Sequence, residues 1–275
     1  MATVRPYTVN TYAFTLTATA EACVDTLASW QAPGIELMMY PGHAWPAEME
    51  ASRRTALRRR AADASIKVVS LNMPNIDINI AAAAPAMRAY SLDLLCDILR
   101  LAADLGATGV VIGPGKANPL MPAPAATLLG HFHAGLDRLV PLAGQLGVHL
   151  LVENMPFAWL PDAAGLMAAI AGYPADVVRV CYDLANAHFI NEAPATGFPV
   201  VAPRLALVHL SDTCRDVYRH APVGTGDVPF ALGAAAARAV GYTGPVALEV
   251  IADDPATIPA SASALAPSGW AAIAG

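Results

Sequence analysis

The amino-acid sequence predicts a (β/α)8 barrel in a single domain that spans residues 1–275. Eight short runs rich in Val, Ile and Leu recur along the chain, separated by longer segments rich in Ala and Leu with helical period. Most runs are continuously apolar rather than alternating, as expected of parallel strands covered on both faces. Because a doubly wound open sheet would rarely need so many parallel strands, a closed barrel is the better fit.

The eight expected strands follow in chain order. They are YTVNTYA (7–13), GIELMM (34–39), IKVVSLN (66–72), GVVIG (109–113), VHLLVEN (148–154), VRVCYD (178–183), LALVHLSD (205–212) and PVALEVI (245–251). Residues 86–106 and 126–147 show apolar positions at intervals of three and four and end in Gly, which predicts crossover helices. Two proline-rich stretches predict a loop at 194–203 and a loosely helical tail at 255–267.

Composition excludes several classes of protein. Although 56% of the residues are apolar, no stretch of about 18 apolar residues is free of Pro, Gly or charge, so we expect no membrane span. The first 14 residues hold no apolar block of signal-peptide length, which favours a cytoplasmic protein. A net charge of -6 argues against a nucleic-acid partner. The basic run at 53–60 has the spacing of a solvated helix face.

Four consecutive predicted strands carry polar residues at or near their carboxyl ends. These residues are Glu153, Asp183, His209 and Glu249. Each acid taken alone could be a helix N-cap or the partner of an arginine. In a barrel, however, these strand ends converge, and three carboxylates beside an imidazole would repel each other unless a cation lay among them. The ligand set suits Mn²⁺, Mg²⁺ or Co²⁺ about as well as Zn²⁺. A further acid, Glu36, lies in the middle of the second strand, where it could form an internal ion pair or serve function.

Several motifs resemble the metal-binding strand ends of the xylose isomerase-like TIM barrel superfamily. They are LLVENMP (150–156), CYDLANAH (181–188), LVHLSD (207–212), RHAPVGTGDVPF (219–230) and VALEV (246–250), and the stretch VVSLNMPNIDIN (68–79) is also similar. The superfamily includes sugar isomerases and epimerases, dehydratases of inosose and 3-dehydroshikimate, and endonuclease IV. The resemblance implies that Glu153, Asp183, His209 and Glu249 bind one divalent metal. It also implies that Glu153 and Glu249 transfer protons across an enediolate.

The resemblance also suggests residues that bind the substrate. Arg219 would contact substrate oxygens, and His220 beside it could serve the same pocket. The tagatose 3-epimerase-like subgroup has a His where this chain has Asn186, with His188 two residues on, and a second Glu where this chain has Trp159. Trp159 could stack on a sugar or simply pack, and Lys116 could meet a phosphate or a carboxylate or be solvated. The expected substrate-binding residues are Asn72, Lys116, Trp159, Asn186, His188, Asp212, Arg219 and His220.

These features predict a metal-dependent isomerase or epimerase of a small keto-sugar or sugar phosphate. The alternatives are a dehydratase of a cyclic polyol ketone, of the 3-dehydroshikimate or inosose type, and a non-catalytic sugar-binding barrel. An endonuclease IV-like nuclease is disfavoured, because the ends of strands three and four, LNMP and IGPG, lack the extra histidines of its metal cluster. A small-molecule sugar is the expected partner, and the resemblance allows a homodimer or homotetramer.

Overall fold

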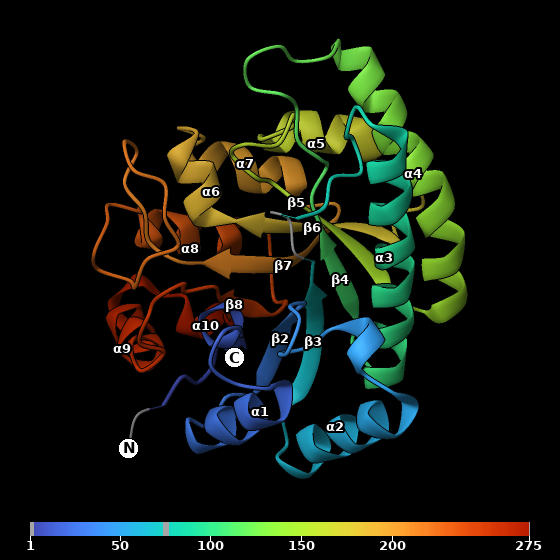
Figure 1. The fold of residues 1–275 in the computed structure, drawn as a ribbon. Helices are drawn as coiled ribbons and strands as arrows, with labels where there is room; N and C mark the ends of the chain where they lie inside the picture. Colours follow the sequence, from blue (N-terminus) through green and yellow to red (C-terminus); the bar gives the residue numbers. More distant parts are fainter. Residues whose placement is uncertain (1–2, 74–76, 275) are drawn as a thin grey trace.

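The computed structural model describes residues 3–73 and 77–274, and it shows one closed barrel of eight parallel strands (Figure 1). Each strand pairs with the next along the chain, and β8 pairs with β1, so the predicted fold class is confirmed. The strands are β1 (Thr8–Asn10), β2 (Gly34–Met38), β3 (Lys67–Asn72), β4 (Gly109–Ile112), β5 (His149–Glu153), β6 (Val178–Asp183), β7 (Leu205–Leu210) and β8 (Val246–Leu248). Within the loop predicted after the third strand, residues 74–76 lie outside the described residues.

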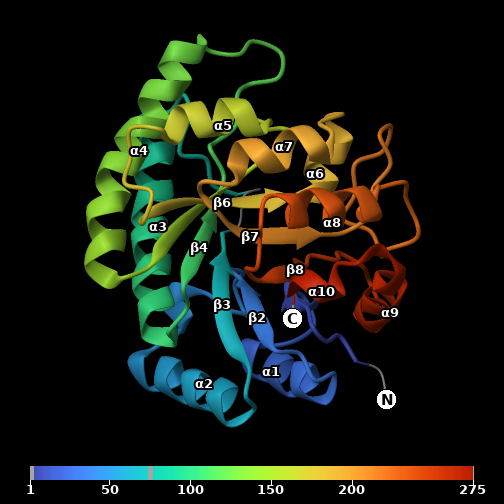
Figure 2. The same ribbon diagram turned by 180° about the vertical axis from the view of Figure 1, so that it is seen from behind.

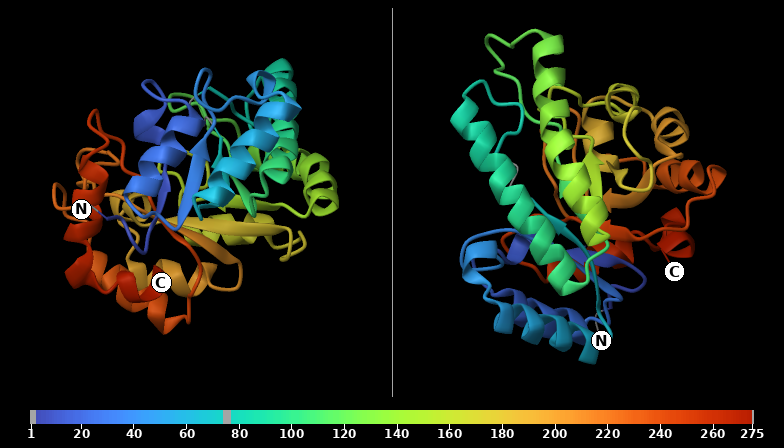
Figure 3. Two further views of the ribbon diagram at one scale, coloured as in Figure 1. Left: turned by 90° about the horizontal axis from the view of Figure 1, so that it is seen from below. Right: turned by 90° about the vertical axis from the view of Figure 1, so that its right-hand side faces the viewer.

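Helices surround the barrel. They are α1 (Ala20–Ser29), α2 (Ala51–Asp63), α3 (Pro85–Leu105), α4 (Ala125–Leu146), α5 (Ala163–Ile170), α6 (Leu184–Phe189), α7 (Pro194–Val201), α8 (Phe230–Ala239), α9 (Thr257–Ala264) and α10 (Ala271–Ala274), with short 3-10 turns at Tyr12–Phe14, Pro46–Glu48 and Ala266–Ser268. The long helices α3 and α4 pack side by side along one flank (Figures 2 and 3). Each ends at a glycine with positive φ, Gly106 and Gly147, as the sequence predicted. No helix among the described residues is long and apolar enough to span a bilayer.

Three segments differ from the sequence-based expectation. The last strand, expected over 245–251, spans Val246–Leu248, so Glu249 lies just beyond it. The first strand ends at Asn10 rather than near residue 13, because the Asn10 Oδ1 accepts a hydrogen bond from the Tyr12 backbone N–H at 2.7 Å and turns the chain. The predicted loop at 194–203 contains helix α7 instead. Its Pro194 occupies the first turn, where the missing N–H costs nothing, and Phe198 and Val201 are buried on its inner face.

The basic run at residues 53–60 lies on α2, and three of its five arginines pair with acids of neighbouring helices. Arg53 pairs with Glu21 of α1 at 2.8 Å, and Arg54 pairs with Asp104 of α3 at 2.7 Å. Arg60 pairs with Asp25. These partly exposed ion pairs join adjacent helices, in keeping with a solvated helix face.

The barrel interior holds a layer of apolar side chains on which the functional site rests. Val111, Leu151, Cys181, Leu207 and Ala247 form this layer and are almost fully buried. Since side chains two residues apart on a strand share a face, the next interior positions toward the carboxyl ends are four polar residues. Those positions are Glu153, Asp183, His209 and Glu249. The pleat of four adjacent strands therefore sets the polar residues directly above an apolar base.

Candidate metal centre

The four residues predicted as metal ligands lie together at the carboxyl end of the barrel. Glu153 and Asp183 end β5 and β6, His209 lies in β7, and Glu249 follows β8. All four are buried, with exposed fractions of 0–6%. One ligand atom from each residue lies within 4.8 Å of the ligand atoms of the other three. A single ion could therefore contact all four side chains.

The contacts within this cluster leave polar atoms unsatisfied. The Nδ1 of His209 lies 3.2 Å from Glu249 Oε2, 3.3 Å from Glu153 Oε1 and 4.0 Å from Asp183 Oδ2. Among the described residues, neither this nitrogen nor Asp183 Oδ2 has a hydrogen-bond partner. Buried polar atoms without partners are costly and rare in folded proteins. A cation bound between the carboxylates would satisfy both atoms.

Asp183 serves two purposes with its two oxygens. Its side chain caps α6 by accepting a hydrogen bond at Oδ1 from the Asn186 backbone N–H at 2.6 Å. Its Oδ2 turns toward His209 and His220, at 4.0 Å and 3.8 Å from their Nδ1 atoms. The N-cap interpretation of this acid and the ligand interpretation are therefore compatible, since the cap leaves one oxygen available.

Burial and mutual repulsion control the charges of the three acids. Burial, followed by the charge of Glu249, raises the pKa of Glu153 to about 8 and the pKa of Asp183 to about 8. Burial also acts to raise the pKa of Glu249, but His209 and His220 outweigh it and the pKa is lowered. Without a cation, the cluster thus keeps one acid ionised in preference to the other two. A divalent ion would stabilise all three as carboxylates, so the residues present fit such an ion.

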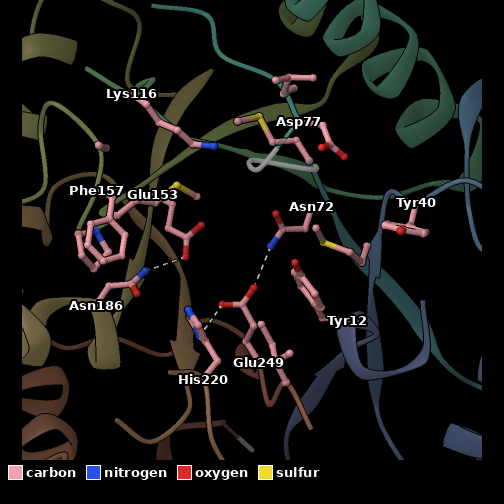
Figure 4. A pocket seen from close by; sticks show the side chains of 18 of the residues that line it. Tyr12, Tyr40, Asn72, Asp77, Lys116, Glu153, Phe157, Asn186, His220 and Glu249 are labelled. Atoms are coloured by element: carbon pink, nitrogen blue, oxygen red, sulfur yellow. Dashed lines mark hydrogen bonds and ion pairs between the residues drawn. The ribbon is translucent and has the colours of Figure 1, made fainter. Parts of the chain in front are cut away.

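A cavity of about 660 Å³ opens onto this cluster (Figure 4). Glu153 and Glu249 line it, whereas Asp183 and His209 are fully buried and are not among its lining residues. The cavity volume falls within the range of about 300–1,000 Å³ typical of small-molecule sites. Two of the four candidate ligands are therefore placed where they could contact both an ion and a small molecule in the cavity.

Four of the expected substrate-binding residues line the cavity. These are Asn72, Lys116, Asn186 and His220. The Asn72 amide donates to Glu249 Oε1 at 3.2 Å, and the Asn186 amide donates to Glu153 Oε1 at 3.4 Å. Burial lowers the pKa of Lys116, whose side chain points into the cavity (Figure 4).

The other four expected residues lie outside the cavity lining. Arg219 is exposed, and the Trp159 indole N–H donates to the Pro114 carbonyl at 2.8 Å while its ring packs edge-on against Phe132. His188 pairs through Nε2 with Asp227 at 2.8 Å. Asp212 holds a loop, as described below. The structure thus gives these residues packing and loop-forming contacts and brings none of the four to the cavity.

Three tyrosines that sequence reasoning did not single out line the cavity: Tyr12, Tyr40 and Tyr218. The Tyr218 hydroxyl donates to Asn186 Oδ1 at 2.7 Å and contacts His220 Nε2 at 2.7 Å, and His220 Nδ1 lies 3.3 Å from Glu249 Oε2. These contacts link Glu249 to Glu153 through Asn186 around the cavity wall. No local pattern in the sequence marks Tyr218, because it lies in a loop between β7 and α8 that contains no regular strand or helix.

The loop that carries Tyr218 and His220 depends on Asp212. This buried carboxylate accepts hydrogen bonds from the backbone N–H groups of Gly224 at 2.8 Å, Thr213 at 3.0 Å and Val228 at 3.2 Å. Gly226 lies against the same turn, where a Cβ would come within 2.4 Å of the Thr213 carbonyl oxygen. The hydrogen bonds to Asp212 therefore fix the conformation of this loop, which has no regular helix or strand to do so.

We expect Asp212→Ala to lower the free energy of unfolding by about 2–4 kcal/mol, because it leaves three backbone donors without their charged acceptor. Urea denaturation monitored by circular dichroism measures the change. Asp212→Asn, which retains one acceptor oxygen, should lose less. A variant with alanine that is as stable as the wild type would contradict this role.

Comparisons with known proteins agree with the fold. A family model described as xylose isomerase-like TIM barrel matches residues 24–269. No curated protein matches the sequence significantly. A D-tagatose 3-epimerase-like protein is 18% identical, with 95% of this chain and 96% of that chain covered and a TM-score of 0.84. An L-ribulose 3-epimerase is 20% identical, with 96% and 93% covered and a TM-score of 0.79. A 3-keto-D-glucoside 4-epimerase from E. coli is 18% identical, with 95% and 98% covered and a TM-score of 0.76.

Proposed function

The chain belongs to the xylose isomerase-like TIM barrel family, and we propose that it is a divalent-metal-dependent isomerase or epimerase of a small keto-sugar or sugar phosphate. One observation carries the proposal: Glu153 and Glu249 both belong to the four-residue ligand cluster and both line the cavity. The names of similar structures, which are sugar epimerases, favour the same class of reaction.

The chemistry divides between the ion and the two glutamates. Glu153, Asp183, His209 and Glu249 would hold a divalent ion, which would polarise a substrate carbonyl and stabilise the negative charge that develops when the neighbouring C–H bond loses its proton. Glu153 and Glu249 reach the cavity from different strands, so one can accept the proton of a C–H bond next to the carbonyl while the other returns a proton. Return to the opposite face of the same carbon gives epimerisation, and return to the neighbouring carbon gives isomerisation.

The cavity walls suit this proton transfer. Met38, Met73, Met155 and Phe157 provide apolar surface around the polar end of the cavity. Excluding water protects an enediolate from stray protonation and strengthens the electrostatic interactions within the site. Lys116 is the residue through which a substrate phosphate or carboxylate could be held, and neutral sugars would not need it.

The test is exchange of substrate hydrogen for deuterium. We expect protein loaded with Mn²⁺, or with Co²⁺ in a parallel sample, to exchange the C–H next to the carbonyl of at least one compound in a panel of ketoses and ketose phosphates in D₂O. Proton NMR of the recovered sugar, after removal of the paramagnetic ion, measures the exchange. Protein stripped with a chelator is the control and should show none.

Two results would replace the proposal by another function. Formation of an ultraviolet-absorbing enone from inosose or 3-dehydroshikimate, without isomerisation, would identify a dehydratase. Tight metal binding with no exchange of any panel compound would identify a non-catalytic barrel.

A further inference from the structure

We propose that Glu36 is a positioning residue that orients His209 toward the metal. The inference rests on the proposed metal-dependent function and deepens it, because it assigns a role to a buried acid that is not in the ligand cluster. Glu36 lies on β2 and His209 on β7, and both side chains are fully buried. The Glu36 Oε1 lies 3.0 Å from the Nε2 of His209.

The two nitrogens of His209 face different surroundings. Nδ1 faces the ligand oxygens of Glu153, Glu249 and Asp183 at 3.2–4.0 Å. Nε2 faces Glu36 on the other side of the ring, in a contact that is short but bent away from regular hydrogen-bond geometry. A neutral imidazole carries its hydrogen on one nitrogen and a lone pair on the other. Metal binding at Nδ1 therefore requires the hydrogen on Nε2, where Glu36 is the acceptor.

Three donors hold Glu36 in place. The Asn10 amide from β1 and the Ser70 hydroxyl from β3 each donate to it at 2.5 Å, and the Asn72 amide from β3 lies at 3.3 Å. A carboxylate surrounded by amide and hydroxyl donors acts as an acceptor only. The hydrogen between Glu36 and His209 therefore lies on Nε2 of the imidazole. This is the tautomer whose Nδ1 lone pair is available to bind a metal.

The same amides also hold a second ligand. Asn10 and Asn72 each donate to Glu249 Oε1 at 3.2 Å. The first three strands contribute none of the four clustered ligands, yet through Asn10, Glu36 and Asn72 they contact two of them. Closure of the barrel brings this buried polar network against the ligands of the later strands. Its geometry is that of a carboxylate–histidine–metal arrangement, in which the outer acid sets ligand orientation and affinity.

The test measures metal affinity and tautomer without substrate. We expect Glu36→Gln to weaken binding of Mn²⁺ and Co²⁺ by about 10–100-fold in isothermal titration calorimetry. Nitrogen-15 NMR of the metal-free protein, at a pH high enough to leave His209 neutral, should show the Nε2–H tautomer in the wild type and a mixture in the variant. The Co²⁺ absorption spectrum should also change. Ser261→Ala is the matched control, since it removes another fully buried polar group, bonded to Val223 and Thr257, away from the ligands.

The possible results are distinct. A folded Glu36→Gln protein with unchanged affinity and tautomer would overturn the positioning role, and affinity lost equally in Ser261→Ala would reduce it to general destabilisation. If Glu36→Gln does not fold, Ser70→Ala removes one donor and keeps the carboxylate. It should weaken binding by a smaller factor, about three- to tenfold, and unchanged affinity there would again overturn the inference. A wild-type protein that binds no divalent metal would instead refute the proposed function.

Discussion

Replacing Glu153 or Glu249 by glutamine is expected to lower the rate of metal-dependent proton exchange by about 10²–10⁴-fold. Each side chain is both a member of the ligand cluster and part of the cavity wall. Glutamine has nearly the same size, but its amide cannot accept and return a proton. One carboxylate oxygen of Glu249 accepts hydrogen bonds from the Asn10 and Asn72 amides, and the other faces His209 and His220. In Glu249→Gln, at least one orientation of the new side-chain amide would therefore direct its NH₂ group at a hydrogen-bond donor.

Binding and proton transfer must be measured separately for these variants. Calorimetry first gives the metal affinity of each variant, and exchange is then followed at a metal concentration that saturates it. Glu192→Gln is the matched control, because Glu192 is a partly buried glutamate bonded to Tyr182 and Ala163 and does not line the cavity. We expect its exchange rate to be unchanged. Metal-saturated Glu153→Gln and Glu249→Gln proteins with full exchange would refute the proton-transfer roles.

The barrel and the ligand cluster could be predicted from the sequence because both follow from short-range regularities. Each strand is an apolar run, and the two-residue repeat of a strand places Glu153 above Leu151 and Asp183 above Cys181. Because the carboxyl ends of parallel strands converge at one end of a barrel, these residues come together there. No knowledge of a specific contact is needed for either step.

Other parts of the site depend on contacts that local sequence does not show. Arg219 was expected at the substrate, but it is exposed, and the loop held by Asp212 brings Tyr218 to the cavity beside the expected His220. Tyr12 reaches the cavity because Asn10 ends β1 early with its side chain. Glu36 was ambiguous as a mid-strand acid, since its nearest imidazole comes from a strand five positions later in the barrel order. Each of these placements is a consequence of loop geometry or of barrel closure.

The second large effect expected concerns the metal-free protein, whose free energy of unfolding should fall as pH rises from about 4.5 to about 8. Burial raises the pKa of Glu153 from 4.5 to about 8 and that of Asp183 from 3.8 to about 8. In this window the unfolded chain has released protons that the folded chain still binds, so the free energy of unfolding decreases as pH rises. Burial lowers the pKa of His209, but Cys181, Glu36 and Glu249 outweigh burial and raise it well above its usual value. Protonated His209 therefore also makes the free energy of unfolding fall as pH rises above that usual value. Glu249 opposes the trend only at acid pH, where its lowered pKa makes protonation destabilising.

A divalent ion should offset part of this loss, because it stabilises the ionised carboxylates that the metal-free cluster disfavours. At 100 times its dissociation constant, a bound ion adds about 2.7 kcal/mol to the free energy of unfolding, a large share of the roughly 5–15 kcal/mol typical of a domain. Urea titrations across pH 5–8, with and without Mn²⁺, measure both effects, and a pH-stat should record protons released on binding. The double variant Glu153→Gln with Asp183→Asn should flatten the pH dependence and abolish the gain from metal. A metal-free wild type that becomes more stable over this pH range would mean that the acids are ionised in the fold without a cation, and the case for a metal centre would fail.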